Sequence, residues 1–216
     1  LNASYSDLQW VISAYTIVFS VLLLIWAKLG DLYGRKLMFI VGLIIFTIGS
    51  GLDAVSTSIG MLHIFRAVQA IGGSALMSLS FALIGTTFNG KERGIALGIL
   101  SSIIGLSTAS GPLVGGWLVD AFSWQSIFTI NLPIGIITII MASLFISNQQ
   151  THHATGSVDY IGMLLSTGTI FSLVFGLVQK EMNASWGWDK MQVAGYLIMA
   201  VILFILFIWR QRTAKN

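Results

Sequence analysis

The stretch Ala27-Lys28-Leu29-Gly30-Asp31-Leu32-Tyr33-Gly34-Arg35-Lys36 joins two long apolar runs, residues 8–29 and 37–55. Each run has the length, about 20 residues, that crosses roughly 30 Å of hydrocarbon as a helix. Gly34 permits the backbone conformation of a very tight turn between two helices. Arg35 and Lys36 are basic residues of the kind that anchor such a turn at the cytoplasmic face. The stretch therefore predicts a helical hairpin that spans a membrane twice.

Similar apolar runs recur along the rest of the chain. The chain has 216 residues, of which 56% are hydrophobic and only 9% charged, with a mean hydropathy of +0.88. Soluble domains carry about 25% charged residues, so this composition excludes a soluble globular domain. We predict an all-α integral membrane bundle of about seven transmembrane helices, at residues 8–29, 37–55, 61–88, 94–119, 124–146, 158–178 and 191–209.

The distribution of basic residues predicts the orientation of these spans. Basic residues gather in the first and third breaks and at the end of the chain, at Arg35 and Lys36, at Lys91 and Arg93, and at Arg210, Arg212 and Lys215. The breaks around Ser56, Asp120 and Lys180 are neutral, acidic or mixed in charge. Basic residues in short loops mark the cytoplasmic side, so Leu1 is expected outside. Seven spans that begin outside, without an opening Met, favour a fragment that lacks a preceding helix.

One break is longer and more polar than the others, and it divides the chain. We expect residues 1–147 to hold five spans of one helical bundle, 148–157 to form a cytoplasmic linker, and 158–216 to hold two additional spans and a cytoplasmic tail. The adjacent His152 and His153 in this linker are expected to be solvated residues and not metal ligands.

Several function classes are disfavoured by what the sequence lacks. The chain has no Cys and three scattered His, which supply neither a nucleophile with a base nor a metal-binding HExxH motif. A retinal protein needs a Lys inside a span, and every Lys lies in a break or at a span end. We therefore expect no enzyme, no metal site and no nucleic-acid partner.

Arg66 is a charged residue placed about five residues inside the third predicted span. A cation costs about 2.5 to 3.5 kcal/mol at the centre of a span. One explanation is that the side chain extends back to the outer interface. The other is a watery cavity, because Gln69, Gly73, Met77 and Ser80 fall on the same helix face.

The fourth predicted span carries small residues at intervals of three or four, followed by Gly111-Pro112-Leu113-Val114-Gly115-Gly116. Small residues let a neighbouring helix approach closely, and Pro112 removes a backbone donor and kinks the helix. The small residues are Gly94, Gly98, Ser101, Gly105 and Ala109. Ordinary tight packing would also account for the stripe alone.

These motifs resemble, in order, those of the major facilitator superfamily. The loop is similar to its GxLxDxxGRK motif, with Ala27 in place of the first Gly. Arg66, Gln69 and Gly72 match its RxxQGxG pattern, with Ala70 in place of Gly. The segment 111–116 resembles the antiporter signature of its drug exporters. Residues 8–15 and 123–135 resemble segments of the fourteen-span drug:proton antiporters, although Gln125 replaces an Arg in the second.

This resemblance implies a role for each motif. Asp31, Gly34, Arg35 and Lys36 would form a conformational latch, and Arg66 would serve proton coupling. The antiporter motif would comprise Gly105, Gly111, Pro112, Gly115 and Gly116. The residues that would line a substrate cavity are Gln9, Ser13, Tyr15, Gln69, Gly73 and Met77.

The resemblance also implies an activity. The expected function is proton-coupled efflux of drugs or amphipathic cationic compounds across a bacterial plasma membrane, driven by the proton gradient without a cofactor. The expected partners are the lipid bilayer, a small drug-like molecule and protons. The alternatives are a truncated fragment that does not transport and a porter of another small metabolite. The last two spans would be the pair that this branch inserts between its two bundles.

Overall fold

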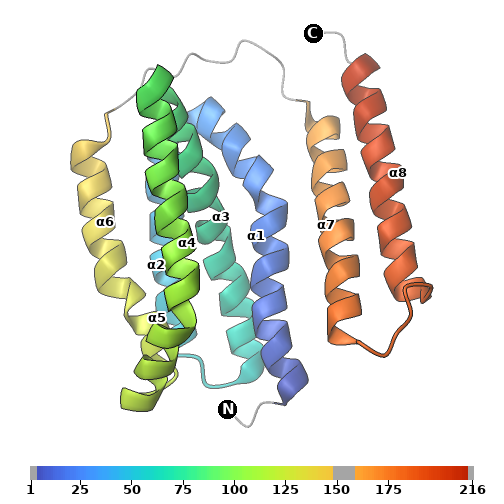
Figure 1. The fold of residues 1–216 in the computed structure, drawn as a ribbon, viewed down its shortest axis with the longest axis horizontal. Helices are drawn as coiled ribbons and strands as arrows, with labels where there is room; N and C mark the ends of the chain where they lie inside the picture. The colour runs from blue at the N-terminus through green and yellow to red at the C-terminus, as the bar shows by residue number, and fades with distance from the viewer. Residues whose placement is uncertain (1–3, 148–158, 214–216) are drawn as a thin grey trace.

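The computed structural model describes residues 4–147 and 159–213, and over these residues it consists of helices joined by short turns (Figure 1). Seven of its helical segments are long and apolar enough to cross a membrane, which confirms the predicted number of spans. The predicted linker 148–157 and its two His lie outside the described residues. The helices are α1 (Tyr5–Tyr33), α2 (Arg35–Ala54), α3 (Ile59–Thr87), α4 (Gly90–Ala121), α5 (Ser126–Thr129), α6 (Asn131–Phe145), α7 (Tyr160–Met182) and α8 (Met191–Thr213).

The span predicted over residues 124–146 differs from expectation because it consists of two helices, α5 and α6. Pro133 lies in the first turn of α6. Proline has no backbone N–H, so it cannot donate to the carbonyl of Thr129, and its ring crowds that carbonyl. The break between the two helices falls at Ile130, between these two residues.

Side-chain caps extend two helices beyond the predicted apolar runs. Ser4 accepts a hydrogen bond from the Asp7 backbone N–H, and the Asp7 carboxylate accepts one from the Ser4 backbone N–H. This reciprocal capping box starts α1 at Tyr5 instead of residue 8. The Ser58 hydroxyl accepts from the Met61 N–H and starts α3 at Ile59. The apolar pattern could not locate these ends, because they are set by polar residues.

The core of the bundle lies where α1, α2 and α3 meet. The buried residues Trp26, Ala75 and Leu79 form its centre. Glycine lets α2 and α3 pack with almost no side chain between them: a Cβ atom at Gly49 would lie 2.6 Å from the Gln69 Cα. The two antiparallel helices are therefore held in a fixed register, which places polar residues of α2 opposite those of α3.

The remaining helices surround this core. Figure 1 shows α6 on one side of it and the α7–α8 pair on the other. The α7 helix packs against α1 as well as against α8, whereas α4 contacts only α3 and α5 among the described helices. Many large apolar side chains point outward, among them Leu113 (77% exposed) and Phe145 (76%). Such a surface suits a hydrocarbon surrounding.

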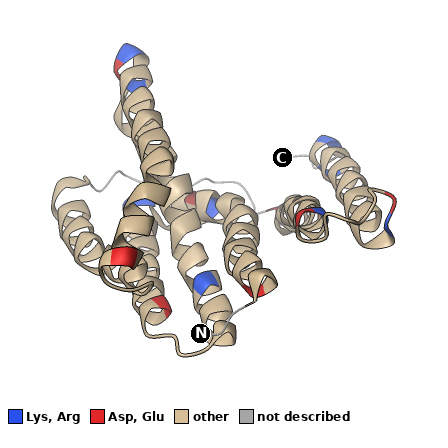
Figure 2. Cartoon of the chain, turned by 60° about the horizontal axis from the view of Figure 1, so that its bottom comes forward, with Lys and Arg blue, Asp and Glu red and all other residues tan. Residues whose placement is uncertain are grey.

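Charged residues lie mostly near the helix ends. Figure 2 shows the helices without Lys, Arg, Asp or Glu over most of their length. The first described residues lie at one end of the bundle and the last at the opposite end (Figure 1), as seven spans require.

We expect the turn between α2 and α3 and the turn between α7 and α8 to lie outside the cell, and the turn between α3 and α4 inside. Because the chain has no Cys, single cysteines can be labelled with an impermeant thiol reagent without background. Thr57→Cys and Ala184→Cys should be labelled in intact cells, since both positions are exposed. Asn89→Cys, also exposed, should be labelled only after the membrane is opened. Labelling of position 89 in intact cells would reverse the predicted orientation.

Candidate functional site

The Arg66 side chain points into the helical bundle and is held by side chains from three helices. Its Nη1 donates to Oε1 of Gln69, one turn further along α3. Its Cζ lies 4.3 Å from the centre of the Tyr15 ring of α1 and 5.7 Å from that of Phe128 of α5. A guanidinium over an aromatic face is attracted by the ring quadrupole. These contacts hold the cation among protein groups instead of at the outer interface.

A chain of hydrogen bonds continues from Arg66 to α2 and α6. The Gln69 side chain, which is 2% exposed, donates through Nε2 to Oγ of Ser50 at 2.6 Å. Asn131 of α6 donates through Nδ2 to the same oxygen at 3.3 Å. Gln69 thus accepts from Arg66 while it donates to Ser50. This network fixes the position of Arg66 relative to two other helices, α2 and α6.

Sequence reasoning missed Asp53, an acidic residue beside this network. It lies in the last turn of α2, one turn beyond Ser50, and is completely buried. Neither carboxylate oxygen has a hydrogen-bond partner, and the side chain interacts electrostatically with Arg66. A signal for it was present: an ionisable residue inside a predicted span is a candidate functional residue by default.

We call Arg66, its contacts Tyr15, Gln69 and Phe128, and the adjoining Gly73 the Arg66 cluster. Of the six residues predicted to line a cavity, three belong to this cluster and three do not. Gln69 and Tyr15 contact Arg66. Gly73 makes room for Tyr15, because a Cβ atom at this position would overlap the tyrosine hydroxyl. No hydrogen bond in the described part of the chain joins the cluster to the three others, Gln9, Ser13 and Met77, of which only Ser13 is buried.

The predicted latch residues lie at the opposite end of the bundle. Gly34 has a φ of 97°, a conformation that favours glycine. The Asp31 carboxylate accepts two hydrogen bonds from Arg35, at 2.7 and 3.1 Å. Arg35 also donates to the carbonyl of Ala82 in α3 at 3.0 Å, and Lys36 donates to that of Ser143 in α6 at 2.8 Å. The turn between α1 and α2 is therefore also bonded to α3 and α6, so that it links four helices. Its role as a latch remains a prediction.

The predicted antiporter motif lies on a helix with few neighbours. The α4 helix continues through Pro112. A Cβ atom added at any of the four glycines of the motif would meet nothing within 4 Å. The close helix packing that the small residues predict therefore has no partner in the described part of the chain. These glycines are Gly105, Gly111, Gly115 and Gly116.

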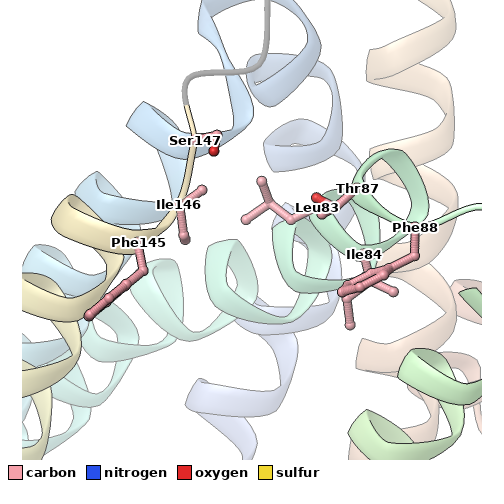
Figure 3. A pocket seen from close by; sticks show the side chains of 7 residues that line it. All are labelled: Leu83, Ile84, Thr87, Phe88, Phe145, Ile146 and Ser147. Carbon is pink, nitrogen blue, oxygen red and sulfur yellow. The ribbon is translucent and has the colours of Figure 1, made fainter. Parts of the chain in front are cut away.

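A pocket of about 270 Å³ lies between the end of α3 and the end of α6 (Figure 3). Its lining is mostly apolar and includes Leu83, Ile84, Phe88 and Phe145. Leu83 is about 25 Å from Arg66 along α3, at 1.5 Å per residue. The pocket is therefore separate from the Arg66 cluster.

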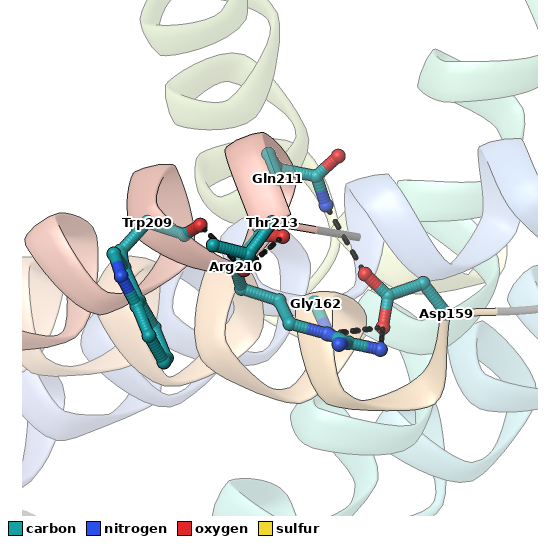
Figure 4. A network of polar contacts seen from close by, with 6 residues as sticks. All are labelled: Asp159, Gly162, Trp209, Arg210, Gln211 and Thr213. Carbon is teal, nitrogen blue, oxygen red and sulfur yellow. Dashed lines mark hydrogen bonds and ion pairs between the residues drawn. The ribbon is translucent and has the colours of Figure 1, made fainter. Parts of the chain in front are cut away.

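A second polar network joins α7 to α8, and it was not predicted (Figure 4). Asp159 caps α7 by accepting the Gly162 N–H at 3.0 Å, and it also accepts hydrogen bonds from Arg210 and Gln211 of α8, each at 3.3 Å. The Gly162 N–H and the Arg210 guanidinium hold the pKa of the Asp159 carboxyl below its ordinary value. The carboxylate form therefore stabilises this end of the helix pair.

Asp159→Asn should loosen the start of α7, because the amide cannot reproduce the charge interaction with Arg210. A lowered pKa means that the stabilisation is present above the carboxyl's ordinary pKa of about 3.9 and is lost as the pH falls through the lowered value. Backbone hydrogen exchange at Gly162 and Met163 should be faster in the variant at neutral pH, and the difference should vanish in strong acid. Equal exchange at neutral pH would show that the charge contributes nothing.

Comparison with known proteins agrees with this arrangement. The family model described as Major Facilitator Superfamily matches residues 1–209 of the chain. The chain belongs to the major facilitator superfamily. Its described residues include seven helices that are long and apolar enough to cross a membrane, so the chain is a multi-pass membrane protein of this superfamily of transporters. Its bacterial relatives indicate the bacterial plasma membrane.

Relatives within the superfamily include export proteins. The tetracenomycin C resistance and export protein of Streptomyces glaucescens is 33% identical over 216 residues, covering 100% of this chain and 40% of that protein. The multidrug transporter protein MdtP of Bacillus subtilis (strain 168) is 34% identical, covering 98% and 38% respectively. The riboflavin transporter RibZ of Clostridioides difficile (strain 630) is 35% identical, covering 95% and 43%. The chain thus spans about two fifths of the length of these relatives.

Proposed function

We propose that this chain forms part of a proton-coupled exporter of drugs or amphipathic cationic compounds. The observation that carries the proposal is the Arg66 cluster, a fixed cation inside the bundle, bonded to Gln69 and stacked on Tyr15. A cation in a membrane span is costly and marks an ion or substrate pathway. Relatives that are named for multidrug and antibiotic export support the direction of transport.

The energy source in this proposal is the proton gradient, without a cofactor and without a chemical reaction on the substrate. The protein is then a transporter and not an enzyme. Its partners are the lipid bilayer, a drug-like molecule and protons. Transporter sites lie between two structural repeats near the middle of the membrane. Residues 4–147 would supply one side of such a site, and α7 with α8 would be an additional pair of spans.

The proposal assigns a separate task to each motif. The Arg66 cluster takes part in proton coupling. The turn with Asp31, Gly34, Arg35 and Lys36 acts as a latch, because its hydrogen bonds to α3 and α6 must break if these helices separate. The exposed glycine face of α4 is available for close packing with another helix of the complete transporter.

Transport of a metabolite is the second candidate, and the relative named as a riboflavin transporter favours it. The two candidates differ in the charge of the substrate. A cationic substrate is attracted to aromatic faces, and the Tyr15 face at the cluster is already occupied by Arg66. A neutral or anionic aromatic compound could approach the guanidinium directly.

Liposomes with an imposed pH gradient test the proposal. The gene product in its full natural length should move a cationic dye when the gradient is present, and a protonophore should stop the movement. Residues 1–216 alone should move no dye, because a transporter site lies between two structural repeats and this chain spans about two fifths of the length of its relatives. Riboflavin replaces the dye in a parallel experiment. Movement of riboflavin but not of dye would favour the metabolite porter, and dye movement that ignores the gradient would refute proton coupling.

A further inference from the structure

Asp53 is the one buried residue among the eight acidic residues of the chain, all of which are described. It is 0% exposed, and both carboxylate oxygens lack a hydrogen-bond partner. Buried polar groups are almost always hydrogen-bonded, and a buried charge without hydrogen bonds is expensive. A buried carboxyl in this condition needs an explanation beyond packing.

The fixed register of α2 and α3 brings Asp53 to Arg66. Ser50 of α2 is hydrogen-bonded to Gln69 of α3. Asp53 lies three residues after Ser50 in α2, and Arg66 lies three residues before Gln69 in α3, so both are one helical turn closer to the loop that joins the two helices. The carboxyl and the guanidinium therefore lie opposite each other in the same register. The two interact electrostatically. They form no ion pair within 4 Å, since the two ion pairs of the described chain are Asp31 with Arg35 and Asp159 with Arg210.

Few other charged groups face this pair. Among the helices packed against α2, the α1 helix supplies Tyr15, which interacts electrostatically with both Asp53 and Arg66. The α5 and α6 helices contain no titratable side chain. Arg66 is thus the cation that faces Asp53, and its Nε also lacks a hydrogen-bond partner. Asp53 and Arg66 each therefore have a buried side-chain atom that forms no hydrogen bond in this structure.

We infer that Asp53 is a proton-exchange site whose occupancy is controlled by the position of the Arg66 side chain. In the arrangement described here, Arg66 is engaged with Gln69 and Tyr15, and the Asp53 carboxyl holds a proton. When the guanidinium moves to Asp53, the two groups pair and the O–H proton of the carboxyl passes to water. Arg66 stays charged throughout, so one proton leaves and nothing is oxidised or reduced.

The burial of Asp53 favours a proton over a cationic substrate as its ligand. A drug-sized cation would have to separate α2 from α3, which are in direct backbone contact at Gly49. A proton needs only a water molecule, and Asp53 lies within five residues of the turn at the end of the bundle. The inference rests on the proposed function, since it names the group that carries the coupled proton.

Labelling with dicyclohexylcarbodiimide tests the inference without any transport measurement. This apolar reagent reacts with protonated carboxyls in apolar surroundings. In the purified full-length protein, the peptide with Asp53 should be labelled at low pH, and labelling should fall as the pH rises and the carboxyl loses its proton. Asp31, which is ion-paired and partly exposed, is the internal control and should stay unlabelled.

Arg66→Ala distinguishes control of Asp53 by Arg66 from a purely structural role of Arg66. A purely structural role would leave the pH dependence of Asp53 labelling unchanged. Without the guanidinium to stabilise the carboxylate, Asp53 should keep its proton to higher pH, so its labelling curve should shift upward by at least one pH unit, a tenfold change in proton affinity. Arg66→Lys should shift it less. An Asp53 that is unlabelled at every pH, or a curve unchanged by Arg66→Ala, would overturn the inference.

Transport separates this inference from the proposed function. In liposomes, Asp53→Asn should reduce gradient-driven efflux at least tenfold, and Asp53→Glu should restore part of it because a titrating group returns. If the unmodified transporter ignores the gradient, the proposed function fails, and the labelling curve still decides whether Asp53 exchanges protons. If the gradient drives efflux equally well in the unmodified transporter and in the Asp53→Asn variant, Asp53 does not carry the coupled proton.

Discussion

Arg66→Ala in the full-length transporter should reduce proton-driven efflux by about ten- to a hundredfold. The substitution removes a charge-assisted hydrogen bond to Gln69 and the stacking on Tyr15. Hydrogen bonds to charged groups contribute about 1.5 to 3 kcal/mol, and each 1.4 kcal/mol corresponds to about a tenfold change. Drug-dependent proton release from everted membrane vesicles measures the effect.

Arg66→Lys is the matched control for charge. Lysine keeps the cation but cannot reproduce the planar guanidinium, which bonds to Gln69 while it stacks on the ring. It should therefore restore only part of the activity. The amount of each variant in the membrane must equal that of the unmodified protein. Normal proton release by Arg66→Ala would mean that the side chain is an interfacial anchor without a part in coupling.

Gly49→Ala should destabilise the transporter by about 1 to 3 kcal/mol or more, the usual cost of overpacking. The new methyl group would lie 2.6 Å from the Gln69 Cα and 2.8 Å from its backbone nitrogen. Backbone atoms cannot turn aside as a flexible side chain can, so α2 and α3 would have to separate. Their separation would also stretch the 2.6 Å hydrogen bond between Gln69 and Ser50. The midpoint of thermal unfolding in detergent should fall.

Gly51→Ala, two residues further along the same helix, is the matched control. Its new Cβ would meet only Cδ2 of Leu132, at the ordinary distance of 3.4 Å. Alanine is about 0.8 to 1.0 kcal/mol more favourable than glycine in a helix interior, so this variant should be as stable as the unmodified protein or more so. Equal unfolding midpoints for the two variants would show that the close approach at Gly49 is not limiting.

The sequence predicted the seven spans because each is long, apolar and separated by charged or turn residues. It also predicted that Gln69 shares a helix face with Arg66, since a spacing of three residues is a local property of a helix. The structure places these two in contact. The superfamily was identified from motifs, and the family comparison confirmed it.

Features that depend on how different helices meet were not predicted. The electrostatic interaction of Asp53 with Arg66 depends on the register of α2 against α3, which in turn depends on the close approach at Gly49. Asp159 and Arg210 are 51 residues apart in sequence, and only the antiparallel packing of α7 and α8 brings them together. The break between α5 and α6 could have been expected from Pro133, but the apolar run around it looked continuous.

The Asp159 network joins α7 and α8 at the end of the hairpin opposite the loop that connects them. One end of the pair is joined by the chain between Met182 and Met191. The other end is joined by the hydrogen bonds that the Asp159 carboxylate accepts from Arg210 and Gln211. Among the described helices, the pair contacts the rest of the chain only through α1. Loss of the pair would uncover one face of α1 and leave the Arg66 cluster intact, because the residues that contact Arg66 lie in α1, α3 and α5.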